Sequence, residues 1–100
     1  MELARTNEAG YVRLHIGGEL DAITAPELRG VFEQLAAESP RRVVLDLTTL
    51  RLIDSSGVGA IVALFKQLRR RGGTLGVTGL SGQPRSIFRL LRLDRVLEVE

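Results

Sequence analysis

The sequence predicts an α/β fold with a mixed, mostly parallel sheet. Strand-like and amphipathic helical runs alternate over most of the chain, and this order implies parallel strands joined by right-handed crossovers. Two strand-like runs separated by a short polar turn at the N-terminus add an antiparallel hairpin. With 100 residues, 44% of them apolar, the chain suits one small core. We therefore expect a single domain over residues 1–100, with four to five strands, an N-terminal β-hairpin and three βα crossovers.

The hairpin is predicted from residues 3–6 and 11–16, with a turn at 7–10. The second run alternates apolar and polar residues at period two, which favours a half-buried strand. Its apolar face consists of Val12, Leu14 and Ile16. His15 falls on the polar face, so we interpret it as an exposed strand residue, and Gly17-Gly18 are expected to end the strand.

The first helix is predicted over about residues 25–38. The segment Thr24-Ala25-Pro26-Glu27 has the S/T-x-x-E form of a capping box, with proline in the first turn. Apolar residues then recur at helical spacing, at Leu28, Val31, Phe32, Leu35 and Ala36. Ser39-Pro40 is expected to stop the helix, because the residue before a proline avoids helical geometry.

The middle of the chain repeats the strand–helix pattern. Residues 42–47 are nearly continuously apolar, as in a strand buried on both faces, and residues 48–53 lead from it to a polar turn. A second apolar helical face follows, formed by Val58, Ile61, Val62, Leu64, Phe65 and Leu68. Gly72-Gly73 are expected to end this helix, since glycine readily takes the left-handed cap conformation.

The last part of the chain predicts one more strand–helix–strand unit. A short strand is expected at residues 74–78 and a loop at 79–84. The third helix carries the apolar residues Ile87, Phe88, Leu90 and Leu91. A short edge strand within residues 94–99 completes the expected sheet.

The composition argues against several functional classes. The chain has no cysteine and one histidine, which excludes disulfides and thiolate sites and leaves little basis for a metal site. No apolar run approaches the roughly 20 residues of a membrane span, and no signal-peptide core is present, so we expect a cytoplasmic protein without a cofactor. The pI of about 9.9 raises the question of nucleic-acid binding. However, the arginines are scattered, and their one run, Arg69-Arg70-Arg71, suits the last turn of a helix.

Catalysis is not favoured by the residues available, and we expect no enzyme. His15, the one histidine, lies mid-strand, and no G-x-S-x-G elbow surrounds Ser55. Asp21 and Asp54 could pair for acid–base work, but a chain this short offers no deep pocket. Gly57-Val58-Gly59 lacks the third glycine of a dinucleotide-binding loop, and no P-loop motif occurs.

The most informative stretch is Asp54-Ser55-Ser56, at the predicted N-terminus of the second helix. Free backbone N–H groups and the positive end of the helix dipole favour negative charge there. The connector that holds Asp21 follows another parallel strand, so both loops should face the same edge of the domain. The plainer interpretation is a helix N-cap, for which one such residue suffices. Gly57 and Gly59 in the first helical turn suggest instead a flat surface for a docking protein.

The pattern Asp54-Ser55-Ser56-Gly57-Val58-Gly59, after the apolar strand at 43–47, resembles the signature of STAS domains. It is most similar to that of bacterial anti-sigma factor antagonists. The segment Gly18-Glu19-Leu20-Asp21 matches the second signature of the family, and the order of elements agrees over nearly the whole chain. Many relatives continue into a further C-terminal helix beyond the position of Glu100. The resemblance implies a STAS-like fold.

The resemblance also implies a phosphorylation-controlled partner switch. In this family the serine directly after the aspartate is phosphorylated, here Ser55, by an anti-sigma factor that is a serine kinase and uses ATP. The unphosphorylated form binds that anti-sigma factor and thereby releases a sigma factor, and a serine phosphatase resets the switch. Asp21 would lie beside Ser55 at the partner interface, together with residues 54–59. From the residues alone, Ser56 stays the rival phosphorylation site.

Other functions stay open at this point. The chain could be a STAS scaffold subunit of a stress-signalling complex or of a lipid-transport ATPase. It could also be a small nucleotide- or lipid-binding module that uses the same helix N-terminus. We expect no direct nucleic-acid or membrane partner, and a weak homodimer is compatible with the sequence.

Overall fold

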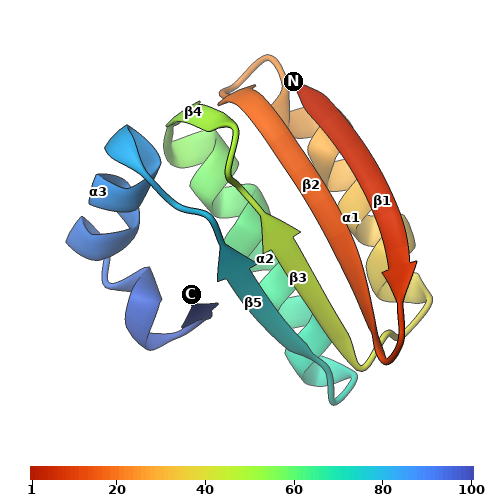
Figure 1. The fold of residues 1–100 in the computed structure, drawn as a ribbon. Helices are drawn as coiled ribbons and strands as arrows, with labels where there is room; N and C mark the ends of the chain where they lie inside the picture. Colours follow the sequence, from red (N-terminus) through yellow and green to blue (C-terminus); the bar gives the residue numbers. More distant parts are fainter.

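The computed structural model describes all residues from Met1 to Glu100 (Figure 1). The elements are, in order, β1 (Glu2–Glu8), β2 (Tyr11–Leu20), α1 (Ala25–Ala37), β3 (Arg42–Asp46), β4 (Leu50–Ile53), α2 (Ser55–Arg70), β5 (Thr74–Thr78), α3 (Gly82–Leu90), the 3-10 turn η1 (Leu93–Arg95) and β6 (Glu98–Val99). The predicted α/β class with three βα crossovers is confirmed. None of the helices is long and apolar enough to cross a lipid bilayer.

The strands form a mixed sheet in the order β1-β2-β3-β5-β6, and β4 pairs with β2 beyond the end of β3. The pair β1–β2 is antiparallel, as the predicted hairpin requires, and the other pairs are parallel. Helices α1 and α2 cover one face of the sheet, whereas α3 lies beside the β5 edge (Figure 1). A cluster of 21 buried apolar residues forms the core.

The sheet has six strands, where the sequence predicted four to five, because residues 48–53 contain β4. Asp46 ends β3 by turning the chain. Its Oδ1 accepts hydrogen bonds from the Thr48 N–H (3.1 Å) and the Thr48 hydroxyl (2.6 Å). After this turn, the chain resumes pairing with β2 as a new strand. β3 and β4 therefore lie end to end along one longer neighbour.

The predicted end of β2 at Gly17-Gly18 is wrong, since the strand continues to Leu20. Its first half pairs with β3, and its last residues pair with β4, where Leu20 lies opposite Ile53. The register shifts between Gly18 and Glu19, and Gly18 has a φ of 86°. Glycine thus serves as a bulge in a continuing strand, and not as its terminus.

The predicted capping box of α1 is also wrong. Thr24 precedes the helix, but its side chain makes no cap hydrogen bond. Its hydroxyl instead donates to the Glu19 carbonyl (3.1 Å) and accepts from the Asp21 N–H (3.0 Å). The end of α2 agrees with the prediction, with Arg69 and Arg70 in its last turn.

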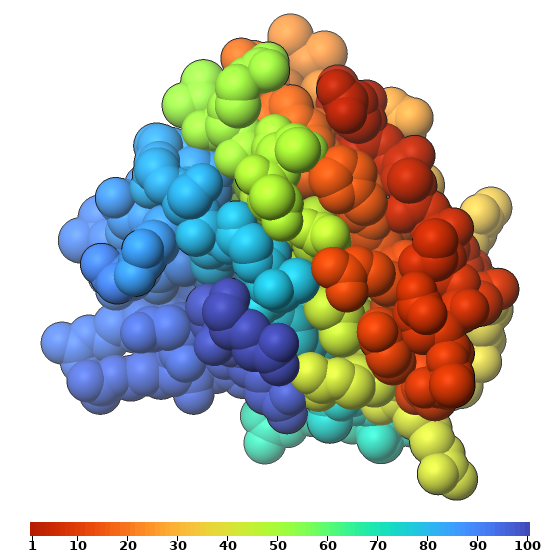
Figure 2. Space-filling view, viewed as in Figure 1, coloured from red at the N-terminus to blue at the C-terminus, as the bar shows by residue number.

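The C-terminal segment differs from the strand expected at residues 94–99. Arg92 adopts a left-handed conformation with a φ of 57°, and the 3-10 turn η1 follows it. Only Glu98–Val99 is left to pair with β5. Arg42 of β3 forms an ion pair with Glu98 across β5. In the space-filling view this segment lies against β5, on the side of the sheet away from β1 (Figure 2).

Candidate functional site

The predicted site lies where β2 and β4 end side by side. Leu20 pairs with Ile53, and the Asp54 N–H donates to the Leu20 carbonyl at 3.0 Å. Asp21 and Asp54 directly follow the paired residues, so their turns are neighbours. The prediction that both loops face one edge is therefore confirmed, although Asp54 follows β4 and not the strand at 42–46.

Asp54 is the N-cap of α2. Its Oδ1 accepts hydrogen bonds from the Ser56 N–H (2.9 Å) and the Gly57 N–H (3.2 Å). Ser55, the first residue of α2, is exposed, and its hydroxyl makes no hydrogen bond within the chain. Ser56 is half-buried. Of the three polar residues in the motif, one is thus used by the fold as a cap, and the Ser55 hydroxyl is left free.

Gly57 is required by packing inside the domain. A Cβ atom at this position would lie 2.7 Å from Leu20 Cβ and 2.8 Å from Ile53 Cγ1. Glycine therefore lets the first turn of α2 approach the ends of β2 and β4. The interpretation of Gly57 as part of a flat outer surface is corrected accordingly. Gly59 is half-buried, and the Arg29 guanidinium of α1 lies beside it.

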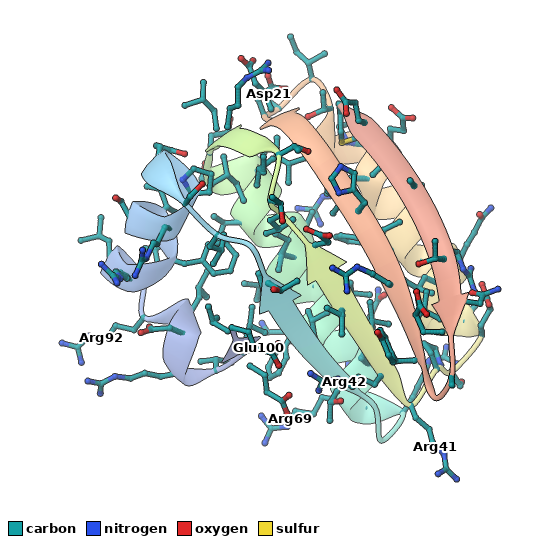
Figure 3. The ribbon with its side chains drawn as sticks, viewed as in Figure 1. Asp21, Arg41, Arg42, Arg69, Arg92 and Glu100 are labelled. Atoms are coloured by element: carbon teal, nitrogen blue, oxygen red, sulfur yellow. The ribbon has the colours of Figure 1, made fainter.

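The Asp21 turn has a similar arrangement of hydrogen bonds. Asp21 Oδ1 accepts from the backbone N–H groups of Thr24 (3.0 Å) and Ile23 (2.9 Å). These hydrogen bonds lower the pKa of Asp21, and the bond from the Thr24 N–H has the largest effect. The carboxylate therefore stays ionised near neutral pH. The Ile23 side chain is 88% exposed. Figure 3 shows Asp21 at one end of the molecule and Arg41 and Arg69 at the other, so the predicted site is far from these positive charges.

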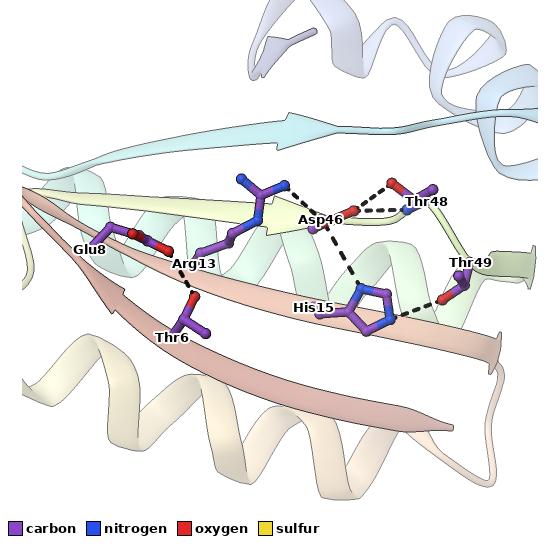
Figure 4. Close-up of polar contacts among 7 residues, drawn as sticks. All are labelled: Thr6, Glu8, Arg13, His15, Asp46, Thr48 and Thr49. Atoms are coloured by element: carbon purple, nitrogen blue, oxygen red, sulfur yellow. Dashed lines mark hydrogen bonds and ion pairs between the residues drawn. The ribbon is translucent and has the colours of Figure 1, made fainter.

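A second polar cluster lies on the open face of the sheet (Figure 4). Arg13 Nη2 lies 2.9 Å from Asp46 Oδ2, and His15 Nε2 lies 2.9 Å from the Thr49 hydroxyl. Burial on its own raises the pKa of Asp46, but hydrogen bonds from Thr48 and Arg13 outweigh it and lower the pKa to about 2. His15 lies on the polar face as predicted, but it is half-buried and hydrogen-bonded to Thr49, so its interpretation as an exposed residue is corrected.

This second cluster has an order of groups that resembles a catalytic triad, but its geometry does not support catalysis. His15 Nδ1 lies 4.0 Å from Asp46 Oδ2, too far for a hydrogen bond. None of the surface hollows is lined by Thr49, His15 or Asp46. No group of three or more His, Cys, Asp or Glu side chains is arranged to hold a metal ion. The contacts of the cluster instead join β2 to the end of β3 and to the turn before β4.

Gln83, near the start of α3, contacts the candidate site and was missed by the sequence analysis. Its side-chain amide makes two hydrogen bonds to the backbone of Ile53, directly before Asp54. An isolated glutamine in a loop-to-helix segment has no periodicity or motif that would reveal such a contact.

The chain forms a small α/β domain with a serine at an exposed helix N-terminus, and similarity to known proteins shows its family. The chain belongs to the STAS domain family, whose model matches residues 2–100. The anti-sigma-B factor antagonist of Listeria monocytogenes is 29% identical over 96 residues, which cover 96% of this chain and 84% of the relative. That of Staphylococcus aureus is 26% identical over 99 residues, which cover 99% of this chain and 92% of the relative.

Solved structures agree with this assignment. An anti-sigma factor antagonist from Mycobacterium paratuberculosis has a TM-score of 0.89 at 26% identity, covering 98% of this chain and 83% of that chain. The anti-sigma factor antagonist SpoIIAA in its unphosphorylated form has a TM-score of 0.85 at 19% identity, covering 99% of this chain and 88% of that chain, and so shares the fold. SpoIIAA has also been solved in a phosphorylated form. The STAS resemblance is confirmed, and these relatives are named as anti-sigma factor antagonists.

Proposed function

We propose that this chain is an anti-sigma factor antagonist controlled by phosphorylation of Ser55. The observation that carries the proposal is the exposed Ser55 hydroxyl, which has no partner in the chain because Asp54 already caps α2. The names of the relatives support the role, and the two forms of SpoIIAA support the modification. The partners are then an anti-sigma factor that is a serine kinase, and a serine phosphatase.

The unphosphorylated surface offers both apolar and polar contacts to such a partner. Ile23 and Leu52 are 88% and 48% exposed, and each lies two residues from an aspartate of the adjoining turns. Apolar side chains of this kind bury surface on binding, while Asp21 and the Ser55 hydroxyl fix the register. The docking surface also includes the half-buried residues Ser56, Val58 and Gly59 at the start of α2, whereas the buried Gly57 contributes by letting this helix start lie close to the strand ends.

Phosphorylation adds negative charge directly after the carboxylate of Asp54. The Ser55 oxygen forms a bond to the γ-phosphorus of ATP, ADP leaves, and the hydroxyl proton passes to a base of the kinase. A charge of about −1.5 to −2 then stands beside Asp54, whose carboxylate already occupies the N–H groups of Ser56 and Gly57. The phosphate therefore stays hydrated, and a partner fitted to the neutral hydroxyl meets both repulsion and a desolvation cost.

The structure supports Ser55 over Ser56 as the acceptor. Ser56 is half-buried, and its N–H is bonded to Asp54 Oδ1 at 2.9 Å, which holds this residue in the first turn of the helix. Ser55 is exposed. A kinase can therefore reach the Ser55 hydroxyl without unwinding α2.

Two matched alanine variants test the proposal. The anti-sigma factor kinase of the host cell is incubated with labelled ATP and with the wild-type chain, Ser55→Ala or Ser56→Ala. We expect label on the wild type and on Ser56→Ala, and none on Ser55→Ala, which should still bind the kinase. Ser55→Asp should bind at least about tenfold more weakly, because the added charge opposes docking. Undiminished labelling of Ser55→Ala would refute the assignment of Ser55.

A further inference from the structure

The backbone of Ile53 is held by a side chain where a sheet would normally supply another strand. β4 has one strand neighbour, β2. On the other edge of β4, Gln83 Oε1 accepts from the Ile53 N–H at 2.9 Å, and Gln83 Nε2 donates to the Ile53 carbonyl at 2.8 Å. The N–H and C=O of one strand residue point to the same edge, so a side-chain amide can pair with both as a neighbouring strand would.

The contact between Gln83 and Ile53 holds the end of β4, which leads into the serine turn formed by residues 54–57. Ile53 is 2% exposed, so its backbone groups need partners within the protein. The next residue, Asp54, donates its N–H to the Leu20 carbonyl of β2 at 3.0 Å. The backbone is therefore hydrogen-bonded on both sides here: Ile53 bonds to Gln83 of α3, and Asp54 bonds to β2. Ser55 follows immediately, at the first position of α2.

We propose that Gln83 is a positioning residue for Ser55, through which α3 controls how the hydroxyl is presented to the kinase. The inference rests on the function proposed above. Gln83 lies 30 positions from Ile53 in the sequence, so this link joins the serine turn to an element that carries none of the predicted site residues. Gln83 does not touch the transferred phosphoryl group; it acts through the backbone of Ile53.

The link should affect the rate of phosphoryl transfer more than partner binding. Loss of the clamp leaves the β4 edge free to open, and small displacements of a reacting group lower rates steeply. We expect kcat for phosphorylation of Ser55 to fall about tenfold in Gln83→Ala, with KM within about twofold, because the contacts of Ile23, in the Asp21 turn, do not depend on β4. Gln83→Glu keeps the acceptor and the shape but loses the donor to the Ile53 carbonyl, and should lower kcat similarly.

The experiment measures the clamp and the reaction separately in the full chain. Amide hydrogen exchange followed by NMR reports the Ile53 N–H, and steady-state kinetics with the isolated kinase and ATP report Ser55. Gln34→Ala and Gln34→Glu, on the exposed side of α1, are matched controls for loss of an amide and gain of a charge. We expect faster exchange at Ile53 and lower kcat in the Gln83 variants only. If Gln83→Ala does not fold, Gln83→Glu is the test, since it keeps the side-chain volume.

The outcomes separate this inference from the proposed function. Unchanged exchange at Ile53 in the Gln83 variants would overturn the clamp, whatever the kinase does. Faster amide exchange at Ile53 together with a wild-type kcat would overturn the positioning role of Gln83. A fall in kcat that only matches a loss of folded protein, measured on the same samples, would likewise overturn it. Absence of phosphorylation in the wild type would instead refute the proposed function, and the exchange data would still decide whether the clamp exists.

Discussion

The Asp21 and Asp54 turns share the same hydrogen bonds from an aspartate to the backbone but differ in how their hydroxyl groups are used. In each, an aspartate follows a strand end, and its Oδ1 accepts hydrogen bonds from the backbone N–H groups two and three residues later. The Asp21 turn is then closed by the Thr24 hydroxyl, which bonds to Glu19 and Asp21. At the equivalent place in the other turn stands Gly57, and the exposed Ser55 hydroxyl makes no hydrogen bond within the chain.

The two turns therefore differ in whether their hydroxyl groups are hydrogen-bonded. The Thr24 hydroxyl of the Asp21 turn is bonded, whereas the Ser55 hydroxyl of the Asp54 turn is not. The Asp21 turn uses each of its polar side chains for its own geometry, so it can present only a fixed carboxylate and the exposed Ile23. The Asp54 turn obtains its geometry from one aspartate and from the close packing of Gly57. Because the exposed Ser55 hydroxyl bonds to nothing else in the chain, a change at this hydroxyl would break no hydrogen bond of the fold.

The largest effect on stability is expected when the Asp54 turn is given the threonine that the Asp21 turn has at the equivalent position. Gly57→Thr places a β-branched side chain where a Cβ would already lie 2.7 Å from Leu20 and 2.8 Å from Ile53. We expect a loss of about 3 kcal/mol in the free energy of unfolding, because the end of α2 must move away from the sheet. Urea unfolding followed by circular dichroism measures it.

Gly59→Ala is the matched control for Gly57→Thr. A Cβ at Gly59 meets the Arg29 guanidinium at 3.1 Å, and this flexible side chain can move. The substitution should be neutral or stabilising by up to about 1 kcal/mol, since alanine favours the helix. Equal destabilisation by both variants would contradict the role assigned to Gly57.

A smaller effect is expected from acid at a third aspartate turn, that of Asp46. Its folded-state pKa of about 2 lies below the ordinary value of 3.8. The ionised carboxylate therefore stabilises the fold above about pH 4, and this contribution is lost as the pH falls towards 2. We expect a loss of about 1 to 2 kcal/mol over that range, allowing for solvent screening. In Asp46→Asn the pH dependence of unfolding between pH 4 and 2 should be flatter; an unchanged slope would mean that other carboxylates dominate.

The smallest effects compare the two hydroxyls directly. Thr24→Val removes the acceptor of the Asp21 N–H and should cost about 1 kcal/mol or slightly more. Ser55→Ala removes no bond and should change the free energy of unfolding by less than about 0.5 kcal/mol. Thermal unfolding of the two variants side by side checks this. A larger loss for Ser55→Ala than for Thr24→Val would reverse the distinction drawn between the turns.

The sequence predicted those elements whose burial is periodic. The apolar stripes of α1 and α2 and the alternation in β2 have direct counterparts in the structure. β4 was missed because Arg51 and Leu52, its two middle residues, are both exposed, so four residues show no alternation. The capping box at Thr24 was wrong because the hydroxyl found nearer partners across the preceding turn.

The candidate site was predictable in position but not in detail. Asp21 and Asp54 could be placed at one edge, since both follow parallel strands. Which of Asp54, Ser55 and Ser56 caps the helix could not be read from composition, because all three residue types cap well. The contact between Gln83 and Ile53 depends on how α3 folds back on β4, and such long-range placement leaves no local pattern.

The β1–β2 hairpin also places the N-terminus of the chain near the Asp21 and Asp54 turns. β1 runs antiparallel to β2, and Met1 Cα lies 3.4 Å from where a Cβ of Gly18 would be. Gly18 is three residues before Asp21, about 10 Å along the strand. Polypeptide joined ahead of Met1 would therefore emerge near the Asp21 and Asp54 turns (Figure 1). An affinity tag or fusion partner there would cover the edge that holds both turns, so its removal should increase measured binding of the partner proposed above.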